Sequence, residues 1–221
     1  MKRNLPIGVL VSGSGSNLQS IIDNIESGNL EAEIRIVISN NPVAYALKRA
    51  RQHKIKTAII KHNDFETRES FDREIVGILK SCGVELVVMA GFMRVISSVL
   101  IKAYPNKIVN IHPALLPSFP GMHAQRQALE YGVKFSGCTV HFVDENVDSG
   151  PIIIQAIVPV YEEDTEETLS ARILKEEHRI YPQAIQFLAK NKIRIENRKV
   201  IISEGKCDKL ISIHNPCLSG F

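Results

Sequence analysis

The stretch V-E-L-V-V-M-A at residues 84–90 decides the fold class of this chain. After Glu85 every residue in it is apolar. A strand with one face in water alternates polar and apolar residues, whereas a strand covered on both faces is apolar throughout, as in parallel sheets. Residues 84–90 are therefore predicted to form a buried strand of a parallel sheet.

Strand-like and helical patterns alternate on both sides of this stretch. Short β-branched runs predict strands at residues 7–11, 34–39, 57–60 and 108–111. Between the first two runs, apolar residues recur at helical spacing from residue 18 to residue 25. Strands that alternate with helices imply right-handed crossovers, so the sequence predicts an α/β fold. We expect a Rossmann-like, mostly parallel, doubly wound sheet with helices on both faces.

The pattern changes after Pro113. The elements expected there are a loop, a helix, two strands and a long helix, at residues 113–121, 124–131, 137–143, 151–160 and 165–189. Short strands follow, without a chemical motif. The chain shows no internal repeat and no linker, which favours one domain at residues 1–198 and a C-terminal tail at residues 199–221.

The composition is that of an ordinary globular protein. Hydrophobic residues make up 44% and charged residues 23% of the 221 positions, and the formal charge is +3. The basic residues are scattered, which argues against a nucleic-acid surface. The sequence lacks a signal-peptide pattern and an apolar run of ~18 residues, and its cysteines lack the spacing of metal sites or disulfide scaffolds. We expect a cytoplasmic monomer or homodimer with reduced thiols and no metal, membrane or nucleic-acid partner.

A loop rich in glycine and serine, S-G-S-G-S-N at residues 12–17, joins the first predicted strand to the first predicted helix. Glycines let the backbone approach a ligand, and helix N-termini bind anions, so we expect a phosphate group there. Leu18 occupies the third glycine position of the dinucleotide fingerprint, and the glycine and lysine of a P-loop are missing. The alternative is a tight turn without a ligand. Ser16 and Gln19 are expected to form a capping box.

Asn110 and His112 lie at the carboxyl end of a predicted strand, where ligands bind in open α/β sheets. Side chains two apart on a strand project together, while Ile111 enters the core. An amide beside an imidazole suits oxyanion stabilisation and proton transfer. The alternative is a polar pair that caps the strand. Asp148 is expected to lie near His112 and to raise the pKa of the imidazole.

Glu177 lies on the apolar stripe of the long predicted helix, four residues after Ile173. A carboxylate that faces a core needs a partner. Two interpretations stay open at this point. The carboxylate forms a salt bridge to Arg172 or Lys175, or it binds an amine or a ribose hydroxyl of a ligand.

The segment M-A-G-F-M-R at residues 89–94 ends the central strand with a glycine and flexible apolar residues. Such a segment suits one wall of a site for a flat heteroaromatic ring. It is equally consistent with a packed strand end that binds nothing.

Five segments in order resemble the phosphoribosylglycinamide formyltransferase family over roughly residues 7–189: SGSGSNLQ, AGFMRVIS, NIHPALLPSFPGMHAQRQALEYG, GCTVHFVDENVDSGPIIIQ and EEHRIYP. Each is weak or moderate evidence alone, but together at matching spacing they are highly specific. The resemblance implies a Rossmann-like formyltransferase fold. It also implies transfer of a formyl group from 10-formyltetrahydrofolate to the amine of 5-phosphoribosylglycinamide, in purine biosynthesis. It ends at about residue 198.

The resemblance also implies roles for individual residues. Asn110, His112 and Asp148 match the catalytic trio, with His112 expected between the other two, and His123 and His141 match auxiliary positions. The positions that match acceptor contacts are Gly15, Ser16, Asn17 and Glu177. The positions that match folate contacts are Arg68, Met93, Arg94, Val95, Ile96, Asn110, Asp144, Glu145, Asn146, Val147 and Asp148. In the implied mechanism a neutral amine attacks the formyl carbon, and Asn110 with protonated His112 stabilises the oxyanion.

Three rival functions remain at the level of sequence. A methionyl-tRNA formyltransferase shares the His-Pro-x-Leu-Leu-Pro stretch but carries a further domain and a basic surface. A formyltetrahydrofolate hydrolase resembles this sequence around Asn110, His112 and Asp148, but it has little use for a phosphate-binding loop. A non-catalytic nucleotide-binding module has no need of Asn110, His112 and Asp148 together.

Overall fold

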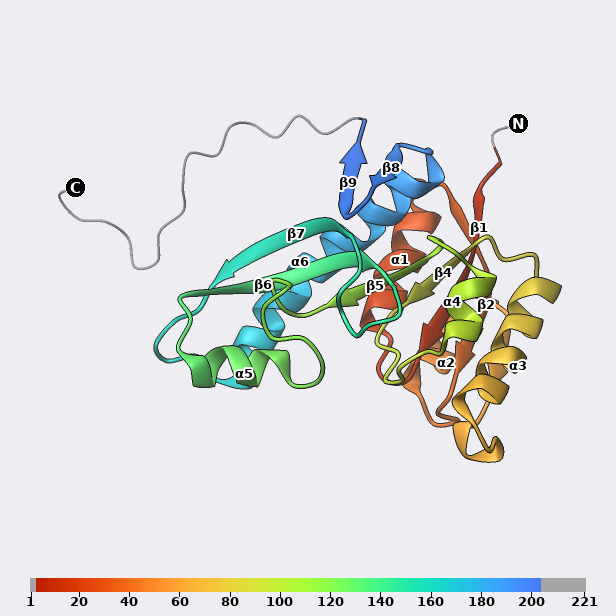
Figure 1. Cartoon of the computed structure of the whole chain (residues 1–221), viewed down its shortest axis with the longest axis horizontal. Coiled ribbons are helices and arrows are strands. Elements are labelled where there is room, and N and C mark those ends of the chain that lie inside the picture. The colour runs from red at the N-terminus through yellow and green to blue at the C-terminus, as the bar shows by residue number, and fades with distance from the viewer. Residues whose placement is uncertain (1–2, 204–221) are drawn as a thin grey trace.

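The apolar stretch at residues 84–90 contains strand β4 (Leu86–Met89), all four residues of which are buried. In the computed structural model, which describes residues 3–203, β4 is the middle strand of a seven-stranded sheet of order β3-β2-β1-β4-β5-β6-β7 (Figure 1). Strands β1 to β5 pair in parallel, and β6 and β7 add antiparallel pairs. The predicted α/β fold, with a mostly parallel sheet, is confirmed.

The other predicted strands and helices are present, whereas helix α4 (Ser98–Ala103) was not predicted. The remaining strands are β1 (Leu5–Val11), β2 (Ala32–Ser39), β3 (Thr57–Ile59), β5 (Ile108–His112), β6 (Phe135–Phe142), β7 (Ile152–Pro159), β8 (Ile193–Glu196) and β9 (Lys199–Ile202). The helices are α1 (Ser16–Glu26), α2 (Tyr45–Gln52), α3 (Arg68–Ser81), α4 (Ser98–Ala103), α5 (Ala124–Tyr131) and α6 (Glu166–Ala189). None of the described helices has the length and apolar character needed to cross a lipid bilayer.

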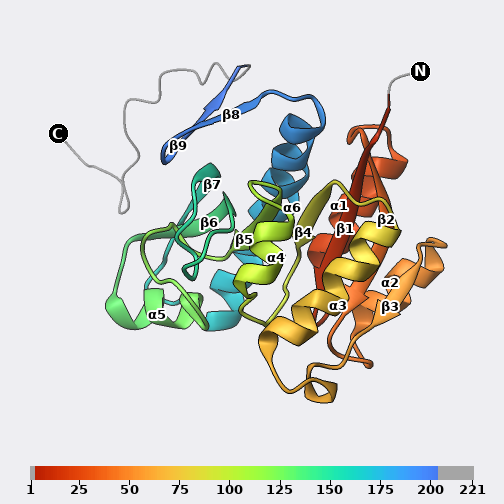
Figure 2. The ribbon, with the colours of Figure 1, turned by 45° about the vertical axis from the view of Figure 1, so that its right-hand side comes forward.

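Helices cover both faces of the sheet (Figure 2). Val9 of β1 packs into one core with apolar residues of α1, α2 and α6, whereas its neighbour Leu10 packs into a second core with residues of α3 and α4. Successive residues of one strand point to opposite faces, so both faces of β1 are buried. This arrangement explains why the parallel strands are apolar throughout.

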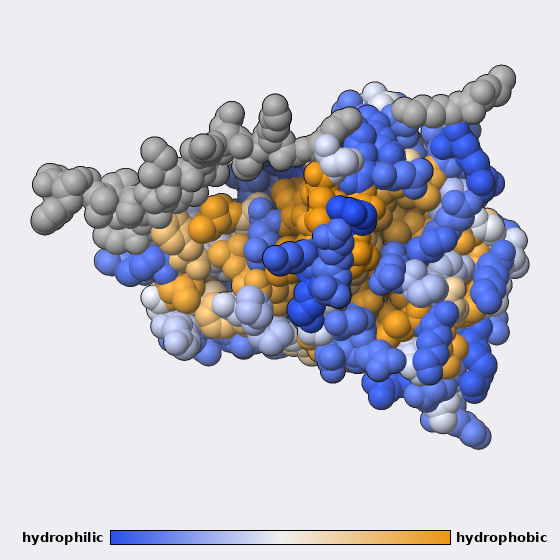
Figure 3. Space-filling view, turned by 45° about the horizontal axis from the view of Figure 1, so that its top comes forward, coloured by the Kyte–Doolittle hydropathy of each residue, from blue (hydrophilic) through white to orange (hydrophobic). Residues whose placement is uncertain are grey.

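Strands β8 and β9 form a separate hairpin that spans the boundary expected after residue 198. Ile195 and Val200 of this hairpin pack against the core of the sheet. Residues 199–202 therefore belong with residues 193–196, and residues 204–221 of the expected tail lie outside the described residues. Figure 3 shows apolar surface between hydrophilic regions on the face turned toward the viewer. Ile201 of β9 is 36% exposed.

A proline inside α6 links this helix to α1. Pro182 has no N–H group, so the carbonyl of His178 lacks its helical hydrogen bond. The hydroxyl of Ser20 on α1 donates to that carbonyl at 2.7 Å. The fully buried hydroxyl of Tyr181 lies 2.9 Å from the carbonyl oxygen of Met89, at the end of β4. These contacts fix α6 against α1 and against the carboxyl end of the sheet.

Candidate active site

Polar side chains meet at the carboxyl end of β5. Asn110 and His112 lie on one face of this strand, as predicted, and Ile111 enters the core on the other. Nδ1 of His112 is 3.3 Å from Oδ2 of Asp148, and Nδ2 of Asn110 is 3.5 Å from Oδ1 of Asp148. Asp148 therefore contacts both partners. The expectation that His112 lies between the other two is wrong, because the turn after β6 folds the carboxylate in between.

The backbone of Asp148 has φ of +50°, in the left-handed region. Aspartate tolerates this conformation better than most other residues. The amide of Gly121 donates to Oδ2 of Asp148 at 2.8 Å, which connects this turn to the proline-rich loop. A Cβ at Gly150 would lie 1.8 Å from the carbonyl oxygen of Phe142, so only glycine allows the turn to pass this close to β6. The turn therefore holds Asp148 at a fixed position over β5.

His112 is 4% exposed, and each of its ring nitrogens faces an oxygen atom, Nε2 that of the Phe119 carbonyl and Nδ1 that of the Asp148 carboxylate. Nε2 lies 2.8 Å from the carbonyl oxygen of Phe119 and must carry a proton, because a carbonyl only accepts. Burial lowers the pKa of His112, whereas Asp148 and the Phe119 carbonyl oppose that shift. Asp148 raises the pKa of His112, as expected, but burial lowers it by more, so the net shift is downward. The pKa of Asp148 is raised by burial but lowered more by His141, Gly121 and His112, so the net shift is downward.

The two auxiliary histidines differ in their positions. His141 is 1% exposed, and its Nδ1 lies 2.8 Å from the carbonyl oxygen of Phe142. Its Nε2 faces Nδ2 of Asn110 at 3.3 Å and Oδ1 of Asp148 at 3.6 Å. His123 is exposed before α5 and contacts none of these described side chains. Within residues 3–203, no group of three or more His, Cys, Asp or Glu side chains is arranged to hold a metal ion.

The glycine and serine loop begins α1 with Gly15 as its cap residue, at φ of +71°. A Cβ at this position would lie 2.5 Å from Cβ of Ala46, so the loop needs glycine for space as well as conformation. The expected capping box of Ser16 and Gln19 is wrong, because Ser16 is already the first helical residue. The amides of Ser16 and Asn17 therefore lie at a helix N-terminus, where the helix itself offers no acceptor.

Glu177 of α6 meets this loop. Nδ2 of Asn17 donates to Oε2 of Glu177 at 2.7 Å, and both side chains are buried. Burial raises the pKa of Glu177, although the hydrogen bond from Asn17 opposes the shift. Within the described residues no salt bridge joins Glu177 to Arg172 or Lys175, and Arg172 bonds Asp164 instead. Oδ1 of Asn17 is buried and has no partner in the described part of the chain.

The loop between β4 and α4 contains most of the expected folate contacts. Met93 and Val95 are 69% and 52% exposed, whereas Ile96 is 8% exposed. Nε of Arg94 is buried without a hydrogen-bond partner among residues 3–203. Arg68 is exposed at the start of α3. This loop thus presents exposed apolar side chains beside an unsatisfied guanidinium nitrogen.

The turn at residues 144–150 contains the other expected folate contacts. The carboxylate of Asp144 accepts from the amide of Asn146 at 3.1 Å and from the hydroxyl of Ser149 at 2.6 Å. Glu145, Asn146 and Val147 are exposed. Asp144 therefore stabilises the turn from within.

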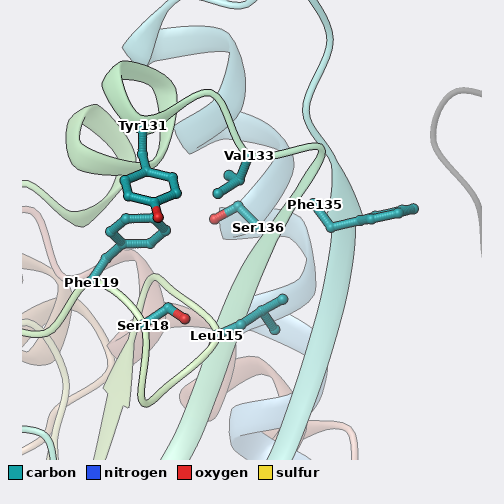
Figure 4. Close-up of a pocket in the computed structure, with 7 residues that line it drawn as sticks. All are labelled: Leu115, Ser118, Phe119, Tyr131, Val133, Phe135 and Ser136. Carbon is teal, nitrogen blue, oxygen red and sulfur yellow. The ribbon is translucent and has the colours of Figure 1, made fainter.

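A cavity of about 350 Å³ lies near the proline-rich loop (Figure 4). The rings of Phe119 and Tyr131 lie edge to face on one side of it, with centroids 5.8 Å apart. Its lining contains no carboxylate, amide or imidazole side chain. The polar cluster around Asp148, rather than this cavity, has the groups that proton transfer requires.

The sequence analysis did not single out Asp72, Phe119 or Gly121. Phe119 and Gly121 act through backbone atoms, so no residue type identifies them. Ser12 belongs to the glycine and serine loop that the sequence analysis identified, but its contact with Met93 was not expected. Asp72 is 1% exposed on the apolar face of α3, where a carboxylate needs a partner, the same signal that identified Glu177.

A family profile and the sequences of known proteins both match this chain. The sequence profile of a family described as "Formyl transferase" matches residues 5–185. The phosphoribosylglycinamide formyltransferase of Escherichia coli is 43% identical over 189 residues, which cover 86% of this chain and 89% of that protein. The trifunctional purine biosynthetic protein adenosine-3 of Drosophila melanogaster is 48% identical over 85% of this chain. This chain spans only 14% of the length of that trifunctional relative.

Solved structures show the same fold. Glycinamide ribonucleotide transformylase 1 from Symbiobacterium toebii is 49% identical with a TM-score of 0.91, and the match covers 92% of this chain and 96% of that one. A formyltetrahydrofolate deformylase from Pseudomonas syringae is 24% identical with a TM-score of 0.85, over 91% of this chain and 66% of that one. At that identity the deformylase shares the fold alone.

Proposed function

This chain belongs to the formyl transferase family, and from that premise we propose that it transfers the formyl group of 10-formyltetrahydrofolate to the amine of 5-phosphoribosylglycinamide. Two sets of contacts carry the proposal. Asp148 joins Asn110 and His112 at the end of β5, and the Asn17–Glu177 contact lies at the start of α1. In the proposal, the first group of side chains serves acyl transfer and the second binds the phosphorylated acceptor.

Gly15, Ser16 and Asn17 bind the acceptor phosphate in this proposal, because their amides lie at the N-terminus of α1. Glu177 accepts from the amine or a ribose hydroxyl of the acceptor. Its carboxylate is buried and receives one hydrogen bond, from Asn17, so it retains capacity for a second donor.

Residues 93–96 and 144–148 bind the folate. The exposed side chains of Met93 and Val95 suit one face of a heteroaromatic ring, and the unsatisfied Nε of Arg94 suits an acceptor atom on that ring. Arg68 suits the anionic glutamate of the folate, since it is exposed and always charged. We also propose a cytoplasmic location, which fits the free thiols of Cys82 and Cys138.

The transfer begins when the neutral amine of the acceptor attacks the formyl carbon. A C–N bond forms, and the electron pair of the carbonyl double bond moves to the formyl oxygen. Asn110 and protonated His112 stabilise that negative charge, which is greater in the transition state than in the ground state. Nε2 of His112 donates to the Phe119 carbonyl in this structure, so it must exchange that acceptor for the formyl oxygen.

The intermediate collapses when the bond between the formyl carbon and N10 of the folate breaks. Its electron pair remains on N10, which takes up a proton, and the acceptor nitrogen loses one. Asp148 suits this transfer, because it contacts His112 directly and is partly accessible to water. In the proposal, a water molecule next to Asp148 carries the proton between the two nitrogens.

Incubation of the purified protein with formylfolate, with and without 5-phosphoribosylglycinamide, tests this function. Transfer that requires the phosphorylated acceptor supports the proposal. Formate release without an acceptor would indicate the hydrolase instead. When methionyl-tRNA is supplied as the acceptor instead, its formylation would indicate a methionyl-tRNA formyltransferase. No turnover with any acceptor would indicate a binding module.

A further inference from the structure

Ser12 joins the two loops that the proposed function assigns to different substrates. It follows β1, is 9% exposed, and begins the acceptor loop at residues 12–17. Its amide donates to the carbonyl of Gly91 at 3.0 Å, and its hydroxyl accepts from the amide of Met93 at 2.8 Å. Gly91 and Met93 belong to the donor loop at residues 91–97, so two hydrogen bonds at one residue connect the loops.

Asn40, which follows β2, fixes the direction of the Ser12 hydroxyl. The hydroxyl has one hydrogen, and it donates that hydrogen to Oδ1 of Asn40 at 2.6 Å. Its lone pairs therefore remain available to the amide of Met93. Nδ2 of the adjacent Asn41 donates to the carbonyl of Ser12 at 3.3 Å. Ser12 is thus held from β2 in the orientation that the donor loop requires.

The other end of the donor loop is held separately. The buried carboxylate of Asp72, on α3, accepts from the amide of Ser97 at 2.5 Å. Asp72 has no hydrogen bond to the acceptor loop among the described contacts. The donor loop is therefore held at both ends, but only its Ser12 end is bonded to the acceptor loop.

We propose that Ser12 is a positioning residue that couples the acceptor loop to the donor loop, so that either substrate favours binding of the other. The inference rests on the proposed function, because it requires the loops to bind the two substrates. A ligand that orders residues 15–17 fixes Ser12, and Ser12 fixes Met93 at the start of the folate contacts. By linkage the effect is reciprocal, and coupling between sites commonly amounts to about 5- to 150-fold.

The experiment measures this coupling by calorimetry. The dissociation constant of 5-phosphoribosylglycinamide is determined alone and with a saturating folate analogue that has no formyl group to transfer. We expect the wild-type acceptor affinity to rise by roughly 5-fold or more with the analogue. Ser12→Ala lacks the hydrogen bonds of the hydroxyl to Met93 and Asn40. In this variant we expect the analogue to raise the acceptor affinity by less than about 2-fold. Ser12→Thr, which keeps the hydroxyl, restores the coupling.

Asp72→Ala is the matched control, because it removes the acceptor of the Ser97 amide and so loosens the end of the donor loop that has no hydrogen bond to the acceptor loop. It should weaken binding of the analogue and retain the coupling factor. Asn40→Ala, which leaves Ser12 itself intact, provides a second variant if Ser12→Ala fails to fold, and it should reduce the coupling. Wild-type coupling in Ser12→Ala or Asn40→Ala, or its absence in the wild-type protein, would overturn the inference. Formyl transfer by the wild-type protein tests the proposed function separately.

Discussion

Nδ2 of Asn17 donates a 2.7 Å hydrogen bond to Oε2 of Glu177, which joins the first turn of α1 to a helix 160 residues further along the chain. The bond places a buried carboxylate next to helix N-terminal amides. Such a carboxylate destabilises the fold unless a partner compensates, so its presence in a core points to a ligand. The proposed acceptor amine or hydroxyl is a suitable partner.

We predict that Glu177→Gln stabilises the protein at neutral pH and weakens acceptor binding. Burial raises the pKa of Glu177 above its ordinary value of 4.5, so the folded state prefers the protonated form. Stability is therefore lost as the pH rises from that value through the folded-state pKa. The variant avoids this loss. Urea unfolding at several pH values measures the difference in free energy of unfolding between the variant and the wild-type protein, which should become smaller below pH 4.5.

The same variant should raise KM for the acceptor about 10- to 100-fold, as expected when a charged hydrogen bond is lost. Glu176→Gln is the matched control, because Glu176 pairs with Arg179 on the outer side of α6. If Glu177→Gln has the wild-type KM for the acceptor, Glu177 does not bind the acceptor.

Replacement of Gly15 by alanine should impair the acceptor site. The variant must adopt φ of +71° and place its Cβ 2.5 Å from that of Ala46, so the start of α1 has to shift. Strained backbone of this kind costs about 1–3 kcal/mol. We expect KM for the acceptor to rise about tenfold or more, with folate affinity less affected.

Gly13→Ala is the control for this loop, because a Cβ there meets nothing within 4 Å. Steady-state kinetics with the acceptor and with its dephosphorylated riboside complete the test. The wild-type protein should use the riboside poorly. Equal use of both compounds would contradict a phosphate site at residues 15–17.

Asn110→Ala and His112→Ala should each lower kcat about 10²–10³-fold, the usual effect of removing one oxyanion donor. Asp148 contacts both residues, so the three side chains should behave as one unit. The double variant of His112→Ala with Asp148→Asn should then be little slower than the worse single variant. Single-turnover rates measure the chemical step, and circular dichroism checks folding. A near-normal rate in a folded single variant would exclude that residue from the reaction.

Asp148→Asn should lower the pKa of His112 further. Burial already lowers it below its ordinary value of 6.5, and the carboxylate opposes that shift. Asparagine tolerates the left-handed backbone at this position, so the variant chiefly removes the charge. Because the folded-state pKa is the lower one, the contribution of His112 to stability is complete above pH 6.5 and is lost as the pH falls through that pKa.

Ring-proton NMR of His112 in the wild-type and variant proteins measures this shift. The exposed His123 is the internal control. If the reaction uses the imidazolium form, the descending limb of the kcat profile should move to lower pH in the variant. A higher pKa of His112 in Asp148→Asn would contradict the assigned electrostatics.

Arg68→Ala should weaken folate binding about 2- to 5-fold at low salt and less at high salt, since an exposed ion pair is weak and screened. Arg73→Ala, at another exposed position of α3, is the control. Titration with a folate analogue at two salt concentrations makes the comparison. If the Arg68→Ala and wild-type proteins bind the analogue equally well at low salt, Arg68 does not contact the folate.

The central strands were predictable because a strand that is buried on both faces is apolar at every position. Leu86–Met89 are apolar for that reason, and Asn110 and His112 project together because strand geometry requires it. The contact between His112 and Asp148 was also expected, and the structure has it at 3.3 Å. These features depend on local geometry or on matched motifs.

Other features depend on the order of the strands and on backbone atoms. Ser12 meets Met93 because β1 and β4 are neighbours in the sheet, and no local pattern specifies that pairing. The central position of Asp148 depends on the amide of Gly121, which every residue type except proline offers. The pKa of His112 depends on how deeply the ring is buried, and the sequence contains no measure of that depth.

Pro182 has a consequence for the distance between the substrate-binding groups. It leaves the carbonyl of His178 without its helical partner, and the Ser20 hydroxyl satisfies that carbonyl from α1. A slip of α6 by one turn, about 5.4 Å, would leave this carbonyl unsatisfied and separate Glu177 from Asn17. A proline that would weaken an isolated helix thus sets the register of two helices, and with it the spacing between the proposed phosphate and amine sites.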